Sequence, residues 1–490
     1  MSRGYQGEVI VCARQRGARI AARLEVVTTN LVKISRNALV WLLLVLVPAG
    51  WIALSQIDQR ADNTELSQAS QGEILPALSP LAAMSGRMAI LVGGQALQQP
   101  NPFGTRPMSQ LAAAISFAQA QMPEQALQQL QEASSADHDA PEPALLQAVR
   151  TIVVAWKFSA SGQTEIVHPS PLTDEQWRLV NDRLGWFGQM AQSKLTADAA
   201  LGTQMEEIDA RFFVAIFAAG LWFLGVGLTG IALLITLPIL ALLTKVRSAL
   251  RAMPRTQALL GETFIVWMLL FIGLHMLSGR FGDGTPTIAR VWLSLSLTFA
   301  SLIALGWPIL RRLSWGELRT AAGLRFEGGL WRLIWMSASS YACALPCMAV
   351  GVAIGLVLSG LLGDRNFQDM SHPVQELLPK ASGGMVFALF AVACVSAPIV
   401  EETMFRGCLY GHVRQQTWGW PRWLSIAFAM LFSATIFAAI HPQGLLAVPA
   451  LAGVSIGFCI TREWSGSVAP GMIAHGLHNG VLLALNLALN

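Results

Sequence analysis

Charged residues are scarce in this sequence: only 13% of its 490 positions are Asp, Glu, Lys or Arg, whereas 53% are hydrophobic. Soluble globular proteins carry about a quarter charged residues. The mean hydropathy of +0.50 points the same way. This balance excludes an ordinary soluble protein and indicates a chain that crosses a membrane several times.

Positive charge is in modest excess, with a formal net charge of +4. The Lys and Arg residues lie in short segments beside apolar stretches. That distribution is typical of membrane topology and not of a nucleic-acid surface. We therefore expect no nucleic-acid partner.

Cysteine is also rare, with six residues in the chain, and all but Cys12 fall in apolar segments. No disulfide framework is visible. Cys343 and Cys347 share a helix face, but without a nearby histidine they are interpreted as small buried residues and not as metal ligands.

The first 211 residues divide into a basic segment, an apolar stretch and a long polar region. Residues 1–36 are rich in arginine and are predicted to stay in the cytoplasm, and residues 37–55 are predicted to be a transmembrane anchor. Residues 56–211 are rich in Gln, Ala, Asp and Glu and predict an α-helical extracytoplasmic domain. Its helical segments are expected near 108–134, 143–157 and 173–193.

From residue 212 onward the chain consists almost entirely of apolar segments of spanning length. The eight candidates are 212–243, 257–277, 291–309, 334–361, 382–416, 422–441, 444–461 and 468–488. Together with the anchor they predict an all-α polytopic integral membrane bundle of about nine spans. The polar domain is then inserted between spans 1 and 2, and residues 212–330 supply additional transmembrane helices.

Two adjacent glutamates interrupt one of these apolar runs, in Ala397-Pro-Ile-Val-Glu-Glu-Thr-Met-Phe-Arg-Gly407. An ionised side chain at membrane depth costs at least ~2.5 kcal/mol, so such a pair indicates a functional site. Glu402 and Arg406 stand at i and i+4 of a helix and are able to neutralise each other. Glu401 points about 100° away and has no local partner, which makes it the candidate for chemistry. Pro398 is expected to kink the helix.

Two further polar clusters follow at helical spacing. Phe437 and His441 are four residues apart, and so are His475 and Asn479. If the three helices face one another, a single cavity holds Glu401, two histidines and an asparagine. Such a set can activate a water molecule and stabilise an oxyanion. Taken singly, each member has a plainer interpretation as an interhelical hydrogen bond or, for Phe437, as packing.

The three motifs, the last within Ser465-Gly-Ser-Val-Ala-Pro-Gly-Met-Ile-Ala-His-Gly-Leu-His-Asn479, resemble those of the CPBP family, the type 2 CAAX prenyl protease and bacteriocin-processing-like intramembrane proteases. The resemblance covers about residues 380–488. It implies an intramembrane endopeptidase whose protease core is residues 331–490. Its implied roles are water activation by Glu401 and His441, an oxyanion hole from His475 and Asn479, and support from Glu402, Arg406 and Phe437.

Three alternatives stay open. Glu401, His441 and His475 are a plausible open zinc site, although the chain has no His-Glu-x-x-His sequence and the resemblance favours a mechanism without metal or other cofactor. A membrane scaffold or bacteriocin immunity protein would bind a partner without catalysis. A transporter would use buried carboxylates for proton coupling, but no inverted repeat is visible.

The expected substrate is a membrane-associated peptide or protein, for which prenylated CAAX tails are the family's example. Arg406, Arg414 and Arg422 are expected to place the end of the Glu401 helix at the cytoplasmic side, so the substrate would enter from there. The expected location is the bacterial inner membrane, within the lipid bilayer, with the N-terminus in the cytoplasm. The extracytoplasmic domain is a candidate surface for a further partner.

Overall fold

The computed structural model describes residues 36–52, 86–88, 90, 107–135, 141–160, 170–196, 198–243, 248–256, 258–279, 287–362, 378 and 381–489. Within these ranges the chain is helical and contains no strand, and seven helices are long and apolar enough to cross a membrane. The predicted all-α polytopic membrane protein is therefore confirmed. Most of the predicted basic segment, residues 53–55 of the anchor and nearly all of 56–106 lie outside the described residues.

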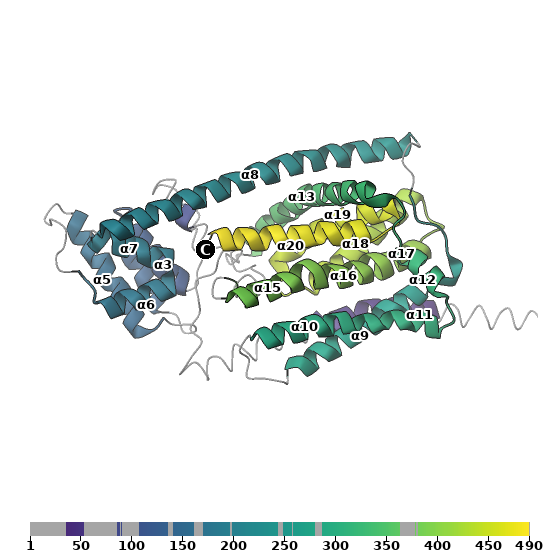
Figure 1. The fold of residues 1–490 in the computed structure, drawn as a ribbon, viewed down its shortest axis with the longest axis horizontal. Helices are drawn as coiled ribbons and strands as arrows, with labels where there is room; N and C mark the ends of the chain where they lie inside the picture. The colour runs from purple at the N-terminus through teal and green to yellow at the C-terminus, as the bar shows by residue number, and fades with distance from the viewer. Residues whose placement is uncertain are drawn as a thin grey trace, which may run out of the picture.

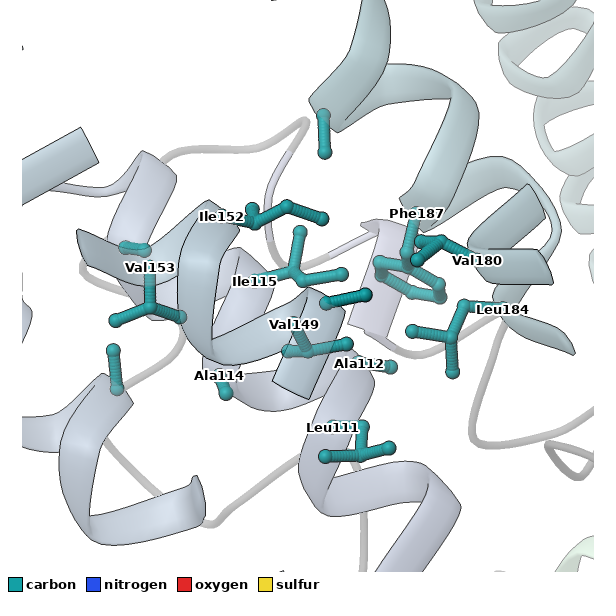
Figure 2. Packing of buried hydrophobic residues seen from close by; sticks show 14 of the residues in the cluster. Leu111, Ala112, Ala114, Ile115, Val149, Ile152, Val153, Val180, Leu184 and Phe187 are labelled. Atoms are coloured by element: carbon teal, nitrogen blue, oxygen red, sulfur yellow. The ribbon is translucent and has the colours of Figure 1, made fainter. Parts of the chain in front are cut away.

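Five helices of the polar region gather at one end of the molecule around an apolar core of their own (Figure 1). They are α3 (Pro107–Gln119), α4 (Pro123–Ser134), α5 (Pro143–Ala160), α6 (Asp174–Leu184) and α7 (Trp186–Thr196). Every residue of α3 except the last is buried. Figure 2 shows Leu111 and Ile115 of α3 among Val149 and Ile152 of α5 and Phe187 of α7. We call these five helices the outer cluster.

Tight turns divide two of the predicted helical segments. Gln121, with a φ of 60°, lies in the turn between α3 and α4, and Gly185, with a φ of 53°, separates α6 from α7. A left-handed backbone conformation ends a helix, and glycine adopts it at no steric cost. Thr173 starts α6 with a capping box, accepting a hydrogen bond from the backbone N–H of Gln176. Segments 108–134 and 173–193 are thus each a pair of helices.

A single helix, α8 (Ala199–Leu242), connects the outer cluster with the membrane bundle (Figure 1). Its 44 residues extend about 66 Å at 1.5 Å per residue. It begins where the Asp198 carboxylate accepts the backbone N–H groups of Ala200 and Leu201, 13 residues before the predicted span. The polar first turns therefore continue the same helix before the predicted span 212–243.

The remaining helices form the membrane bundle. They are η2 (Pro254–Thr256), α9 (Leu259–Gly279), α10 (Ile288–Ala300), η3 (Ser301–Leu305), α11 (Gly306–Leu310), α12 (Trp315–Ala321), α13 (Gly329–Leu362), α15 (Gly383–Ala391), η6 (Val392–Ser396), α16 (Ala397–Glu401), η7 (Glu402–Leu409), α17 (Tyr410–Gln416), α18 (Arg422–Ala439), η8 (Leu445–Ala447), α19 (Val448–Ser465) and α20 (Ala469–Leu489).

Seven of the nine predicted spans correspond to the seven candidate spans. The described part of the predicted anchor is the helix Arg36–Ile52, which counts only as a shorter apolar helix. The last helix, α20, is interrupted by polar side chains such as His475 and Asn479 and is not among the seven. The count of nine therefore stays a prediction.

Two of the three arginines used to orient the Glu401 helix are buried inside the protein. Arg406 is completely buried, and Arg414 forms a buried ion pair of 3.0 Å with Glu463 of α19. Charges that are paired within the bundle do not report which side of the membrane they face, because the positive-inside rule concerns loops. Only Arg422 is exposed, so the predicted orientation rests on the loops.

Candidate active site

The helix from Gly383 to Gln416 carries the two glutamates, and it is wound unusually on both sides of them. The short α16 ends at Glu401, and π-helical segments flank it: η6 over Val392–Ser396 and η7 over Glu402–Leu409. π-Helical turns are rare and occur frequently at functional sites. Pro398, which lacks an N–H, lies at the start of α16. A kink was expected at this proline, and the structure has π-helical segments before and after it.

Side chains from three neighbouring helices donate to carbonyl groups of the widened turns. Nδ2 of Asn479 (α20) donates to the Ala393 carbonyl at 2.7 Å. Oγ of Ser433 (α18) donates to the Phe405 carbonyl at 3.1 Å, and Nε of Arg462 (α19) donates to the Arg406 carbonyl at 3.3 Å. Buried carbonyls without partners are costly, so these donors stabilise the geometry that presents the glutamates.

Glu402 forms a buried cluster of charge with two partners. Its Oε1 lies 2.9 Å from Nη1 of Arg406 and 3.0 Å from Nδ1 of His475. The Arg406 guanidinium also lies 4.4 Å from the ring centroid of Phe437, within the range of a cation–π contact. A Cβ on Gly471 would lie 2.8 Å from Oε2 of Glu402, so a larger residue there would displace the carboxylate.

Glu401 differs from its neighbour in exposure and in surroundings. Its side chain is 24% exposed, whereas that of Glu402 is completely buried. Oε2 of Glu401 lies 4.0 Å from Nε2 of His441 and 3.9 Å from Nε2 of His475. The structure thus brings together Glu401 of α16, His475 of α20 and His441, which lies directly after the C-cap of α18. These separations exceed hydrogen-bond length.

The backbone fixes the ring orientation of His441. Its Nδ1 lies 2.6 Å from the carbonyl oxygen of Phe437, one turn earlier in α18. A carbonyl only accepts hydrogen bonds, so Nδ1 is the donor and the neutral ring has Nε2 as its acceptor nitrogen. The same ring is 4.4 Å from that of Phe437. Phe437, interpreted first as packing, thus contacts both His441 and Arg406.

Asn479 makes a different contact, and two further histidines of the bundle pack against other aromatic rings. Asn479 is half-buried and uses one amide N–H on the Ala393 carbonyl, which leaves one N–H for other partners. His478 faces Tyr341 of α13, with ring centroids 5.9 Å apart. His412 lies 5.4 Å from the ring of Trp41. Neither of these two histidines is part of the group around Glu401.

The fit of a zinc ion to Glu401, His441 and His475 is poor in this arrangement. Ligands about 2.0–2.1 Å from a tetrahedral zinc lie roughly 3.3 Å apart. The separations of 3.9 and 4.0 Å are wider, and no group of three His, Cys, Asp or Glu side chains suited to a metal occurs in the described ranges.

Comparison with known families explains why these motifs occur together. Residues 383–481 match the family model described as type II CAAX prenyl endopeptidase Rce1-like. This part of the chain is thus similar to the CAAX protease family. The matched range contains all the site residues predicted above. A search of curated proteins and a search of solved structures gave no match.

The match of residues 383–481 to this protease family supports an intramembrane endopeptidase. A binding-only scaffold and a transporter are therefore less well supported than an enzyme. The family match begins at residue 383, so the outer cluster, α8 and the helix Arg36–Ile52 lie beyond it.

Two residues that contact the site helix were missed by the sequence analysis. Arg462 is buried at the end of α19, where it also donates to the Ala321 carbonyl at 2.9 Å. A charge at the end of an apolar run could have drawn attention to it. Ser433, inside α18, gave no such signal because serine is common in membrane helices.

Proposed function

We propose that this protein hydrolyses a peptide bond of a membrane-associated substrate with a water molecule activated by Glu401 and His441. The observation that carries the proposal is that Nε2 of His441 and Nε2 of His475 lie within 4.0 Å of the same Glu401 oxygen. This oxygen has no hydrogen-bond partner among the described residues. It is therefore available to accept a proton from water.

In the proposed reaction, the water oxygen attacks the scissile carbonyl carbon while its proton passes to Glu401. The carbonyl oxygen becomes an oxyanion, to which His475 donates from Nε2–H and Asn479 from its remaining amide N–H. The proton then moves from Glu401 to the leaving nitrogen, the C–N bond breaks, and the carboxylate is restored.

Glu402, Arg406 and Phe437 are proposed to support this chemistry without touching the substrate. The Glu402 carboxylate accepts from Nδ1 of His475 at 3.0 Å, which fixes the orientation of the ring and directs its other nitrogen toward Glu401. Arg406 balances the charge of Glu402 at 2.9 Å. A buried pair of this kind is costly to break, because the remaining charge has no compensation.

The decisive experiment compares Glu401→Gln with Glu327→Gln. Glu327 is an exposed carboxylate just before α13, 3.4 Å from Arg325. We expect the wild-type protein and the Glu327 variant to produce cleaved termini in the membrane proteome that are missing with the Glu401 variant. An identical set of termini in all three strains would reject proteolysis by this site.

The substrate class is proposed to be a membrane-bound peptide that enters from the cytoplasmic side, in a bacterial inner membrane. A fluorogenic peptide with a farnesylated CAAX tail, assayed in nanodiscs, tests the prenylated form against the same peptide without the lipid.

Topology is tested by a reporter fused near residue 130, which we expect to be extracytoplasmic. A cytoplasmic signal from that fusion would overturn the orientation.

Zinc is kept as the second hypothesis for the same donors. The proposed mechanism requires that turnover survives prolonged dialysis against a chelator. If the chelator abolishes turnover and added zinc restores it, the result favours a site in which Glu401, His441 and His475 rearrange around the metal.

A further inference from the structure

The helix Arg36–Ile52 lies outside the family match, yet it packs along the protease helices with one face. The residues of this face follow one another at intervals of three or four: Arg36, Val40, Leu44, Val47 and Trp51. Such spacing places side chains on one side of a helix. Leu42 and Leu46, on other faces, are 54% and 53% exposed. The helix is therefore fixed in its rotation about its own axis, with this face toward the bundle.

Polar contacts hold this helix at both ends. At its start, Nε of Arg36 pairs with Glu262 of α9 at 2.5 Å, and the Trp307 indole donates to the other oxygen of that carboxylate at 3.0 Å. At its end, Nε1 of Trp51 donates to the Ile440 carbonyl at 3.4 Å. The two contacts are 15 residues apart, about 22 Å along the helix. Together they fix the position of Trp51 along the bundle.

The acceptor of the second contact is the residue next to His441. Ile440 is the C-cap of α18, and carbonyls at a helix C-terminus have no partner within the helix. The orientation of the Ile440–His441 peptide unit determines where the backbone of His441 lies relative to Glu401. A donor that holds the Ile440 carbonyl thus acts on the side chain four ångströms from the carboxylate.

We infer that Trp51 is a positioning residue for His441, so that the helix Arg36–Ile52 is a working part of the protease and not only an anchor. The inference rests on the proposed role of His441. Trp51 does not touch the reacting atoms; it acts through the Ile440 carbonyl. The indole N–H, and not the bulk of the ring, is the group that matters.

Trp51→Phe removes the donor and keeps an aromatic ring. The matched control is Trp423→Phe, the same change at an exposed position on α18. Full-length proteins in nanodiscs are treated with diethyl pyrocarbonate, and modification of His441 is followed by mass spectrometry with His475 as the reference. Loss of this hydrogen bond should speed His441 modification about fivefold, which corresponds to about 1 kcal/mol. Equal rates in the wild type and in the Trp51 variant would overturn the inference.

Turnover gives a second measurement on the same proteins. With the farnesylated CAAX peptide we expect Trp51→Phe to lower kcat about three- to tenfold with KM unchanged, and Trp423→Phe to match the wild type. In a His441→Gln background, Trp51→Phe should have no further effect, because it acts through that ring. The labelling experiment needs no substrate and decides the question if this peptide is not cleaved.

The two failures are distinguishable. If His441→Gln keeps the wild-type kcat, the proposed function of His441 is wrong. If His441→Gln is inactive while Trp51→Phe changes neither the labelling rate nor kcat, the proposed function stands and Trp51 has no positioning role.

Discussion

In the outer cluster, α3 is enclosed by large apolar side chains of its neighbours, whereas in the membrane bundle α13 and α19 approach each other over glycines. A Cβ on Gly453 would lie 2.2 Å from the Cys347 carbonyl oxygen, and one on Gly457 would lie 2.4 Å from Cα of Ala344. In water, burying large side chains drives association. In lipid that drive is missing, because the acyl chains are as apolar as leucine, and close packing of small residues takes its place.

The two regions also treat buried polar groups differently. The buried polar side chains of the outer cluster are uncharged, such as Ser116, which donates to the Ala112 carbonyl. The bundle encloses charged groups, such as the Glu402–Arg406 pair and the Arg414–Glu463 pair. Buried charge adds little net stability. Substitutions in the outer cluster should therefore act on stability, and polar substitutions in the bundle should also act on catalysis.

The largest effect is expected for Glu401→Gln. Loss of a general base costs ~10²–10⁴ in turnover, and a larger loss is expected if Glu401 and His441 act as a unit. Thermal unfolding should change little, since the Glu401 side chain is partly exposed.

Glu402→Gln should instead destabilise the protein by about 3–5 kcal/mol, because Arg406 stays buried without its partner. If the Glu402 variant is inactive while the Glu401 variant is fully active, the proposed assignment of the general base to Glu401 is wrong.

Asn479→Ala is expected to have the next largest effect on turnover. Removal of one oxyanion donor lowers turnover by ~10²–10³. Because Asn479 also donates to the Ala393 carbonyl, hydrogen exchange of the segment Val392–Ser396 should increase as well. Kinetics and exchange measured on the same preparation separate the two uses; faster exchange with normal turnover would make the residue purely structural.

Leu111→Ala tests the outer cluster. Leu111 is completely buried in α3, and truncation of a buried leucine costs about 2–5 kcal/mol. We expect faster hydrogen exchange in α3 to α7 with no change in the exchange of α18 to α20. The control is Leu127→Ala on α4, which is exposed and should change stability by less than about 0.5 kcal/mol.

Gly457→Leu tests packing in the bundle. The added side chain has to displace the α13 backbone at Ala344, and overpacking of this kind costs about 1–3 kcal/mol. Gly225→Leu on α8 is the matched control, because nothing lies within 4 Å of its Cβ position. Thermal unfolding in detergent measures both. Equal melting temperatures would show that α13 and α19 do not need the close approach.

The smallest effect is expected for Thr173→Ala at the start of α6. The substitution removes the hydroxyl that accepts the Gln176 backbone N–H, and loss of such a cap costs about 1 kcal/mol. Exchange should rise in the first turn of α6 only. If hydrogen exchange also becomes faster in α3, loss of this one cap is enough to let the whole outer cluster unfold as one unit.

By itself, the sequence predicted the helical membrane class, most of the spans and the group Glu401, His441 and His475. These features are local or periodic: the length of an apolar run reports a span, and spacing by four residues reports a shared helix face. The costliness of charge in lipid singled out the same glutamates.

Only the tertiary structure decided how the site is held. The π-helical segments η6 and η7 depend on donors from Ser433, Arg462 and Asn479, which are distant in sequence. The unequal exposure of Glu401 and Glu402 depends on which helices cover each carboxylate. The contact of Trp51 with the Ile440 carbonyl joins positions 389 residues apart. No local pattern encodes such contacts, because they exist only once separate helices have packed.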